Sequence, residues 1–493
     1  MKRIVYWFRN DLRLHDNDGF SRALADADEV LPVFVFDPRW FTEPDSARRP
    51  DTPLNFRKTG LYRTSFLIES VADLRQSLQV KGADLIVRIG NPALILAELA
   101  EDIEAVAIYA SKEVTQEETD VESDLGKRLK PLNINLDLFW QSTLYHVRDL
   151  PFEISRLPDV FTQFRNRIEK YAPVREVIST PDRIRLATDG AGSAIDPEPL
   201  PTIATFGFPS EFSPSAQAAV PFKGGETMAL SRLQHYLWDR DLLRTYKETR
   251  NGMLGEAYSS KFSAWLSLGC LSPRFVYEEV KRYEQERVKN DSTYWLIFEL
   301  LWRDFFRFVA LRYGTRLFKP SGIRHQLGKK WRRDRDLFLR WAGGETGIPF
   351  IDANMRELNM TGFMSNRGRQ NVGSFLVRDL GIDWTWGAAY FESLLVDYDP
   401  CSNWGNWNYV AGVGNDPRED RYFNIYSQAM RYDEEGRFVK HWLPELASVP
   451  SHRVHMVSNI PQQELNEYGV ALGDNYPMPI INPNKWLTAE KNR

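Results

Sequence analysis

The chain has 493 residues and a net charge of −4, and charged residues make up 26% of it. This length exceeds what one hydrophobic core holds, so we expect two or three domains. The charge excludes a globally basic nucleic-acid-binding protein, and any contact with nucleic acid has to come from a local basic patch.

The two cysteines, Cys270 and Cys401, lie far apart, and neither stands in a metal-ligand spacing. This argues against a disulfide framework and fits a reducing compartment. The N-terminus lacks a signal segment, and no apolar run approaches the ~20 residues of a membrane span. We therefore expect a cytoplasmic protein with no membrane segment and no metal site.

Residues 1–145 alternate between strand and helix patterns. Strands are expected at 4–8, 30–36, 84–89, 106–110 and 134–139, and helices at 55–80, from 90–92 to 101, and at 116–130. Such alternation predicts a doubly wound parallel α/β domain, whose ligands bind beyond the carboxyl ends of the strands. Glu113 follows the fourth strand, where a ligand contact is expected. A solvated acid at a helix start is an equally good interpretation. No glycine-rich dinucleotide or Walker fingerprint is present.

The chain then changes character. A helix is expected at 152–171, and residues 179–225 are rich in Pro, Ser, Ala and Gly, which is typical of a long connector. Helical periodicity follows, with segments at 226–238, 291–313, 349–359, 372–378 and 384–395. We therefore divide the chain into an α/β domain (1–145), a connector (146–225) and an all-helical domain (226–493).

Two segments of the helical domain indicate a ligand site. The first comprises Ser259, Ser260, Lys261, Phe262 and Ser263, whose hydroxyls, backbone N–H groups and lysine suit an anion. An ordinary helix cap is the alternative. The second is the helix at 291–313, where Glu299, Trp302, Arg303 and Phe306 share one face. This set suits a pocket for a planar ligand, and an amphipathic helix with a paired charge is the alternative.

Two further segments complete the set. Residues 397–409 hold two carboxylates, three amides and two tryptophans, and residues 366–371 supply two arginines. Buried carboxylates and amides cost free energy unless they find partners. A polar loop between two helices is the alternative for 397–409. Together these residues predict a planar, anionic ligand in a helical domain.

Six blocks in order along the chain resemble the photolyase/cryptochrome family. They are residues 7–13, 268–274, 301–306, 366–369, 397–407 and 442–446. Within the family, the sequence is most similar to the DASH cryptochromes. The resemblance implies an α/β antenna domain, a connector and a helical FAD domain, which agrees with the division above.

The resemblance also implies roles for individual residues. Tyr246 and residues 259–263 match FAD contacts, and Asn403 matches the residue that faces flavin N5, where a neutral amide tunes the flavin without titrating. Asp397 and Arg369 match a salt bridge beside the flavin, with Asp399 near the ring. An electron-transfer chain outward from the flavin matches three tryptophans: Trp407, Trp384 and Trp331. Further flavin or substrate contacts are expected from Glu299, Trp302, Arg303, Phe306 and Asn366.

The implied activity is light-driven repair of cyclobutane pyrimidine dimers, with Glu299 and Trp302 at the lesion. Gln370 and Tyr409 stand where double-strand photolyases carry Met and Trp, so the pocket offers less stacking surface for a flipped base. This predicts repair of single-stranded DNA. We also expect the protein to be a monomer. Residues 364–366 lack the histidines of (6–4) photolyases, which excludes that reaction.

Some alternatives stay open. Glu113 resembles the contact for a methenyltetrahydrofolate antenna, although a deazaflavin or no antenna also fits. A blue-light receptor or DNA-binding regulator without repair activity is the chief rival function. A light-independent nucleotide-binding protein is a third possibility.

Overall fold

The N-terminal strands are apolar, β-branched and aromatic, as expected of strands buried on both faces. The computed structural model describes residues 1–42, 56–189, 192–416 and 422–487. It contains β1 (Arg3–Phe8), β2 (Glu29–Phe36), β3 (Ile86–Ile89), β4 (Ala107–Ser111) and β5 (Asn135–Phe139). All five predicted strands are confirmed. They pair in parallel in the order β3-β2-β1-β4-β5, which confirms the doubly wound sheet.

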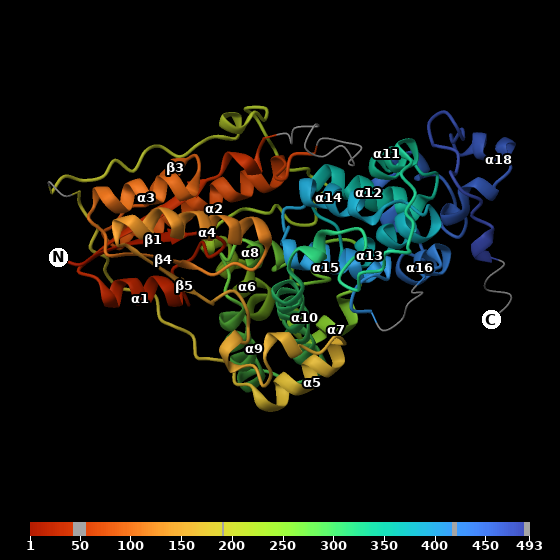
Figure 1. Ribbon diagram of the computed structural model, residues 1–493. Coiled ribbons are helices and arrows are strands. Elements are labelled where there is room, and N and C mark those ends of the chain that lie inside the picture. The colour runs from red at the N-terminus through yellow and green to blue at the C-terminus, as the bar shows by residue number, and fades with distance from the viewer. Residues whose placement is uncertain (43–55, 190–191, 417–421, 488–493) are drawn as a thin grey trace.

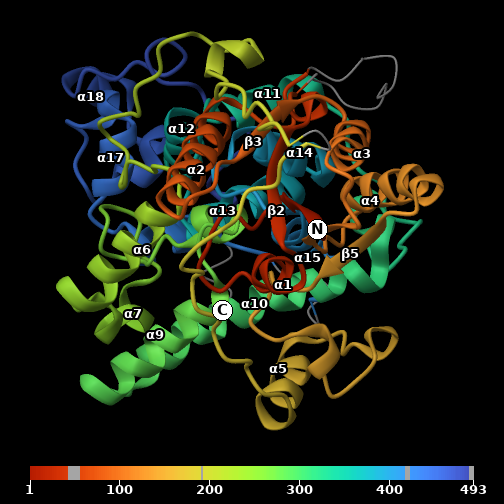
Figure 2. The ribbon, with the colours of Figure 1, turned by 90° about the vertical axis from the view of Figure 1, so that its left-hand side faces the viewer.

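Alternate residues of β1 enter two different cores, because successive side chains point to opposite faces of a sheet. Val5 and Trp7 pack under α3 (Pro92–Asp102) and α4 (Gln116–Leu129). Ile4, Tyr6 and Phe8 pack under α1 (Asp18–Asp26) and α2 (Leu61–Val80), and this second core continues without a break into the helical part. Figure 2 shows α3 and α4 on one side of the sheet and α2 on the other.

The helical part lies beside the sheet and forms the other half of the molecule (Figure 1). The remaining helices are α5 (Phe161–Tyr171), α6 (Glu226–Gln234), α7 (Tyr246–Thr249), α8 (Ser263–Ser267), α9 (Pro273–Glu286), α10 (Asp291–Tyr313), α11 (Arg335–Gly343), α12 (Pro349–Thr361), α13 (Asn366–Ser374), α14 (Trp384–Leu394), α15 (Pro400–Ala411), α16 (Ile425–Tyr432), α17 (Arg437–Trp442) and α18 (Gln462–Glu467). The all-helical prediction for this part is confirmed. The boundaries at 145 and 225 stay predictions.

Several predicted helices have different ends. α2 begins at Leu61 instead of 55, with Gly60 as its N-cap in extended backbone. Gly60 packs closely on α14, since an added Cβ would stand 2.2 Å from the Ser393 carbonyl oxygen. Residue 55 lies outside the described residues. α5 begins only at Phe161, since Pro158 cannot continue a helix. α1 was not predicted, although Asn17 caps it by accepting a hydrogen bond from the Phe20 N–H.

Two predicted helices contain wider turns. The helix at 226–238 ends as α6 at Gln234 and continues as a π-helical turn over His235–Asp239. The segment predicted at 372–378 is the end of α13 and a second π-helical turn over Phe375–Asp379. Turns of this kind cluster at functional sites, and this one joins α13 to the segment before α14.

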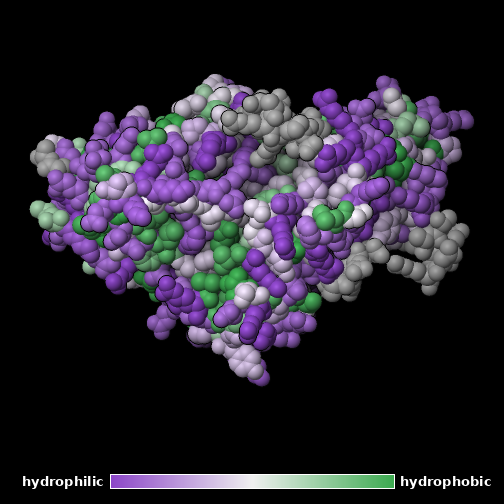
Figure 3. Space-filling view, in the orientation of Figure 1, coloured by the Kyte–Doolittle hydropathy of each residue, from purple (hydrophilic) through white to green (hydrophobic). Residues whose placement is uncertain are grey.

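The connector between 179 and 225 contains little regular structure among its described residues, as predicted, apart from a short helix at Ile203–Phe206. Figure 3 shows a largely polar surface on one face, with apolar residues gathered where the α/β and helical parts meet. Within the described residues, no helix combines the length and the apolar character needed to cross a bilayer.

Candidate functional site

A pocket between α13, α14 and α15 brings together seven of the predicted site residues. Residues 397–409 are not a polar loop: Asp399 caps α15 by accepting a hydrogen bond from the Ser402 N–H at 2.6 Å, and the helix runs on from Pro400. The predicted residues that line this pocket are Asn366, Arg369, Gln370, Asp397, Asp399, Asn403 and Trp407.

An ion pair forms one wall of the pocket. Both Asp397 oxygens accept hydrogen bonds from Nη2 of Arg369, at 3.0 and 2.8 Å, and the Asp397 side chain is only 2% exposed. Arg369 Nε donates to the Met364 carbonyl at 2.9 Å, which fixes the plane of the guanidinium. The sequence-predicted salt bridge is therefore present, and it presents a fixed cation to a ligand in the pocket.

Asn403 has a defined orientation. Its Nδ2 donates to the Ala388 carbonyl at 3.0 Å. Among the described residues, its Oδ1 accepts no hydrogen bond, and the residue lines the pocket. The Ala388 carbonyl can accept a hydrogen bond only from the amide nitrogen of Asn403, so the amide oxygen of Asn403 is the atom left for a ligand. Asn403 therefore offers an acceptor that does not titrate.

The segment from Ser259 to Ser263 is not an ordinary helix cap. α8 begins at Ser263, and no side chain caps it. Lys261 is buried with a positive φ of 57°, and burial lowers its pKa to about 7. Arg232 Nε donates to the Ser260 carbonyl at 3.1 Å, so a second buried cation stands beside the segment. These cations suit an anion such as a diphosphate.

Glu357 gives an independent test of whether a ligand fits here. Its Oε2 is fully buried and has no hydrogen-bond partner within the described part of the chain. Burial raises its pKa to about 8, and the charges of Lys261 and Arg369 act on it in the opposite direction. Glu357 therefore feels charges from both the anion segment and the pocket, and its unsatisfied oxygen fits a polar ligand group such as the ribityl chain of FAD.

Glu299 lies on α10 and forms an ion pair with Arg250. Burial raises the pKa of Glu299, and the adjacent Arg250 opposes that effect. Tyr246 is also buried, and its burial, together with the negative charge of Glu299, raises its pKa. The alternative interpretation of this helix, an amphipathic helix with a paired charge, predicted an ion pair. That ion pair is present, but the partner of Glu299 is Arg250, which lies outside α10, and not Arg303.

Trp302 stacks on Phe161, with ring centroids 3.7 Å apart and planes 8° apart, and meets Tyr409 edge-on at 6.0 Å. Trp302 and Tyr409 thus join α10 and α15 in one aromatic wall. Phe306 lies against α15 at Gly405, where an added Cβ would stand 2.3 Å from its ring. The Gln370 side chain accepts from Arg367 Nη1 at 2.9 Å.

Three tryptophans run outward from the pocket. Trp407 lines the pocket and lies against α14 at Gly387, where an added Cβ would stand 2.3 Å from its ring. Trp384 is fully buried one helical turn before Gly387, a rise of about 4.5 Å. Trp331 is partly exposed, and its indole donates to the Pro320 carbonyl, as that of Trp384 does.

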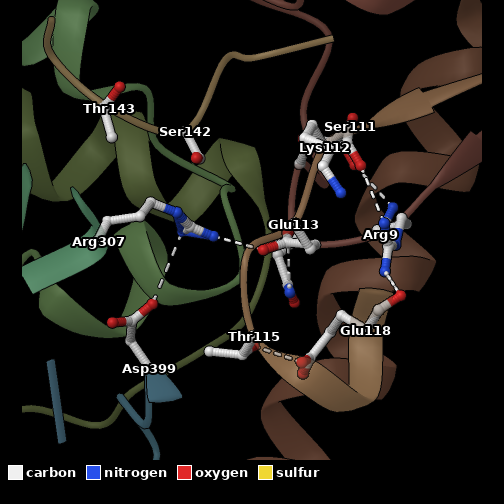
Figure 4. Close-up of polar contacts among 12 residues, drawn as sticks. Arg9, Ser111, Lys112, Glu113, Thr115, Glu118, Ser142, Thr143, Arg307 and Asp399 are labelled. Atoms are coloured by element: carbon white, nitrogen blue, oxygen red, sulfur yellow. Dashed lines mark hydrogen bonds and ion pairs between the residues drawn. The ribbon is translucent and has the colours of Figure 1, made fainter. Parts of the chain in front are cut away.

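Two predicted site residues, Arg303 and Glu113, have their charged groups bound by other parts of the chain. Arg303 does not line the pocket; its guanidinium donates to the carbonyls of Ser142 and Leu266 (3.0 Å for the latter). Glu113 is not a solvated acid, because its carboxylate is buried and pairs with Arg307 of α10. Figure 4 shows Arg307 between Glu113 and Asp399, whose oxygen lies 3.9 Å from Arg307 Nη1.

A second, larger cavity of about 710 Å³ lies beyond the carboxyl ends of β1 and β2, where the sheet meets α14 and α15. This is the position expected for ligands of a doubly wound sheet. Glu113 is not among its lining residues, but Glu118, in the first turn of α4, is. Burial raises the pKa of Glu118, whose carboxylate accepts from the Thr115 hydroxyl. The position of Glu113 after the fourth strand pointed to this region but did not show which carboxylate faces the cavity.

Comparison with known proteins identifies the family. The family model described as "FAD binding domain of DNA photolyase" matches residues 295–492, and "DNA photolyase" matches residues 4–182. Cryptochrome DASH from Synechocystis sp. is 50% identical over 493 residues, 99% of this chain and 97% of that one. The chain belongs to the cryptochrome DASH family. It is accordingly an FAD-binding flavoprotein of the photolyase/cryptochrome type.

Solved structures agree with this assignment. The crystal structure of the Synechocystis sp. PCC6803 cryptochrome covers 100% of this chain and 99% of its own, with a TM-score of 0.92 and 49% identity. An archaeal photolyase from Sulfolobus tokodaii, described as containing two FAD molecules, covers 100% of both chains with a TM-score of 0.75 and 28% identity.

For this cryptochrome DASH chain, the FAD-binding match begins at residue 295 and includes the pocket between α13, α14 and α15. Tyr246 and the segment from Ser259 to Ser263 precede that match. Their assignment as cofactor contacts stays a prediction, and the buried Lys261 and the unsatisfied oxygen of Glu357 are consistent with it.

Proposed function

We propose that this chain is a blue-light-driven lyase that repairs cyclobutane pyrimidine dimers in single-stranded DNA. When bound, FAD supplies the photochemistry, since it absorbs light and lends the dimer one electron while the two cyclobutane C–C bonds open. The observation that carries the proposal is the shared pocket of the Arg369–Asp397 ion pair, Asn403 Oδ1 and Trp407.

The residues of the chain have separate tasks in this reaction. Arg369 holds a positive charge where electron density accumulates, and Asn403 Oδ1 accepts a hydrogen bond without taking up a proton. An electron that is taken from the inner end of the tryptophan series is replaced in steps by Trp407, Trp384 and Trp331, because each indole can be oxidised in turn. Their order from pocket to partly exposed surface supports this direction of electron flow.

The lesion side of the site supports the single-strand preference. Glu299, whose side chain is partly exposed, offers a carboxylate acceptor for a flipped base, and the edge-on contact of Trp302 with Tyr409 limits the flat surface on offer. A Gln at 370 replaces stacking surface with an amide already bound to Arg367. Base stacking contributes about 1–3 kcal/mol, which is comparable to the cost of flipping a base out of a duplex.

We further propose that the cavity beyond β1 and β2 binds an antenna, with 5,10-methenyltetrahydrofolate as its occupant. A volume of about 710 Å³ suits a cofactor of that size, and Trp7, Trp40 and Glu118 supply stacking surface and an acidic contact. The second FAD described for the Sulfolobus tokodaii photolyase is a precedent for a second chromophore in a related protein.

The deciding experiment measures light-dependent repair of one thymine dimer in matched single- and double-stranded oligonucleotides by the reduced holoprotein. We expect repair of the single strand and little repair of the duplex. Equal repair of both would remove the role given to Gln370 and Tyr409. Repair of neither, with a flavin that still photoreduces, would replace the lyase by a light receptor.

A further inference from the structure

The outer end of the tryptophan chain is surrounded by positive charge. Residues 329–335 read Lys-Lys-Trp-Arg-Arg-Asp-Arg, so five cationic side chains flank Trp331 in a protein whose net charge is −4. Lys330, Arg332, Arg333 and Arg335 are exposed, and Lys329 Nζ stands 5.4 Å from the Trp331 ring centroid. This basic patch is therefore local and centred on the indole.

Nearby acids neutralise only part of this charge. Arg332 pairs with Asp334 at 2.5 Å, and Arg333 reaches the buried Asp383 at 3.5 Å. Lys330 and Arg335 have no carboxylate within ion-pair distance among the described residues. In the part of the chain that the structure describes, the exposed Lys330 and Arg335 therefore leave positive charge at the surface beside Trp331.

The segment is also held in place. Arg332 N–H donates to the Gly381 carbonyl at 2.8 Å, and the Asp383 N–H donates back to the Arg332 carbonyl at 3.0 Å. Asp383 is the N-cap of α14, the helix that begins with Trp384. Trp331 and its flanking cations are thus attached to α14, the helix that carries Trp384, the next tryptophan toward the pocket. The positive charge therefore has a fixed position relative to the three tryptophans.

We propose that the basic patch formed by residues 329–335 is a docking surface for a small anionic one-electron reductant that restores Trp331. The inference rests on the proposed electron-transfer chain and specifies the class of molecule that supplies it. Fixed surface charge raises the association rate of an oppositely charged molecule by a factor of about 10–10³, and salt removes the effect.

The step is balanced. After an electron has moved inward from Trp331, its indole is a radical cation. Ascorbate, a monoanion at neutral pH, gives the indole one electron and releases one proton to water, so the neutral indole is restored and an ascorbyl radical leaves. The light-excited cofactor of the proposed function is the oxidant. The surrounding cations also make the Trp331 radical cation a stronger oxidant, since they destabilise its added positive charge.

The first test uses the holoprotein, a laser flash and increasing ascorbate, and follows the decay of the tryptophan radical to obtain a second-order rate constant. At ~0.01 M salt we expect Lys330→Glu with Arg335→Glu to lower this constant about tenfold, and at ~1 M salt to leave it nearly unchanged. Dithiothreitol, which is neutral at pH 7, should show no such difference. The matched control is Lys127→Glu with Lys289→Glu, which makes the same change in net charge on other elements.

A second readout does not use the flavin. The fluorescence of Trp331 is obtained as the difference between the wild type and Trp331→Phe. The quenching constants of anionic iodide and neutral acrylamide are each divided by their values for free tryptophan, and this ratio should be higher for iodide. The Lys330→Glu and Arg335→Glu pair should remove that excess.

The outcomes separate this inference from the proposed function. An ascorbate rate constant insensitive to both salt and charge reversal, in a protein whose photoreduction still requires Trp331, would overturn the docking surface alone. Photoreduction unchanged in Trp331→Phe would overturn the electron-transfer chain and this inference with it.

Discussion

The indole N–H groups of Trp331 and Trp384 donate to one acceptor, the Pro320 carbonyl oxygen, at 3.1 and 3.0 Å. A shared acceptor places the two rings side by side although 53 positions separate them in the sequence. One ring is buried and the other reaches the surface. The pair therefore links the protein interior to solvent.

This relationship predicts the effect of removing either ring. Trp384→Phe should abolish flavin photoreduction, and Trp331→Phe should slow it at least tenfold while FAD remains bound, because phenylalanine is much harder to oxidise than tryptophan. The measurement is the bleaching of flavin absorbance under blue light with a reductant. Trp442→Phe, at the end of α17, should behave as the wild type.

Lys261 predicts that FAD retention depends on pH. Burial lowers the pKa of Lys261 to about 7, and a bound diphosphate would raise it again by favouring the charged form. Above pH 7 binding must therefore take up a proton, so the affinity falls by up to about tenfold per pH unit. Deprotonation of Glu357, whose pKa burial raises to about 8, acts in the same direction.

The measurement is the release of fluorescent FAD on dilution between pH 6 and 9. Lys261→Met should release FAD faster at low pH and lose most of the pH dependence. Lys247→Met, which removes an exposed lysine paired with Asp291, is the control. Equal pH profiles for all three proteins would show that Lys261 does not contact the cofactor.

Glu299 predicts a loss of lesion binding that is separate from cofactor binding. Glu299→Gln keeps the shape but removes the charge, and a charge-assisted hydrogen bond contributes about 1.5–3 kcal/mol. The affinity for a dimer-containing single strand should fall about tenfold or more. Fluorescence anisotropy and the FAD content measure the two effects. Glu248→Gln, on the neighbouring α7, is the control, and parallel losses of FAD and affinity in Glu299→Gln would mean a structural role.

The polar wall at Gln370 and Tyr409 predicts a gain of function. Gln370→Met with Tyr409→Trp restores stacking surface of about 1–3 kcal/mol, so duplex repair should rise about tenfold or more relative to single-strand repair. Tyr409→Phe, which removes only the hydroxyl, should leave the ratio unchanged. A constant ratio in the double variant would place the single-strand preference elsewhere.

The antenna cavity predicts different results for its two candidate acids. Glu118 lines the cavity, whereas Glu113 holds the buried Arg307. Both Glu118→Gln and Glu113→Ala should lower the near-ultraviolet folate band. Only Glu113→Ala should also lower the midpoint of thermal unfolding, because it removes the near acidic partner of the buried Arg307 and leaves it with Asp399, 3.9 Å away. A folate band unchanged in Glu118→Gln but lost in Glu113→Ala would assign the contact to Glu113.

The sequence by itself determined the class of fold and the types of residue at the site. The strands were predictable because a strand buried on both faces is a run of apolar residues, and such a run depends only on neighbours in the chain. The helix beginning at Pro400 was harder, since Asp399 and the amides after it are as typical of a loop as of a capped helix.

Only the tertiary structure decided where the charged side chains point. Arg303 and Glu113 were expected at ligands, yet Arg303 donates to Ser142 and Leu266, and Glu113 pairs with Arg307, 194 residues away. Residues from distant parts of the chain compete for each buried charge, and the partner is chosen by geometry that local periodicity does not contain. The order of the three tryptophans, the cavity beyond β1 and β2 and the fixed position of the cations around Trp331 have the same origin, because each depends on elements that meet only in the folded protein.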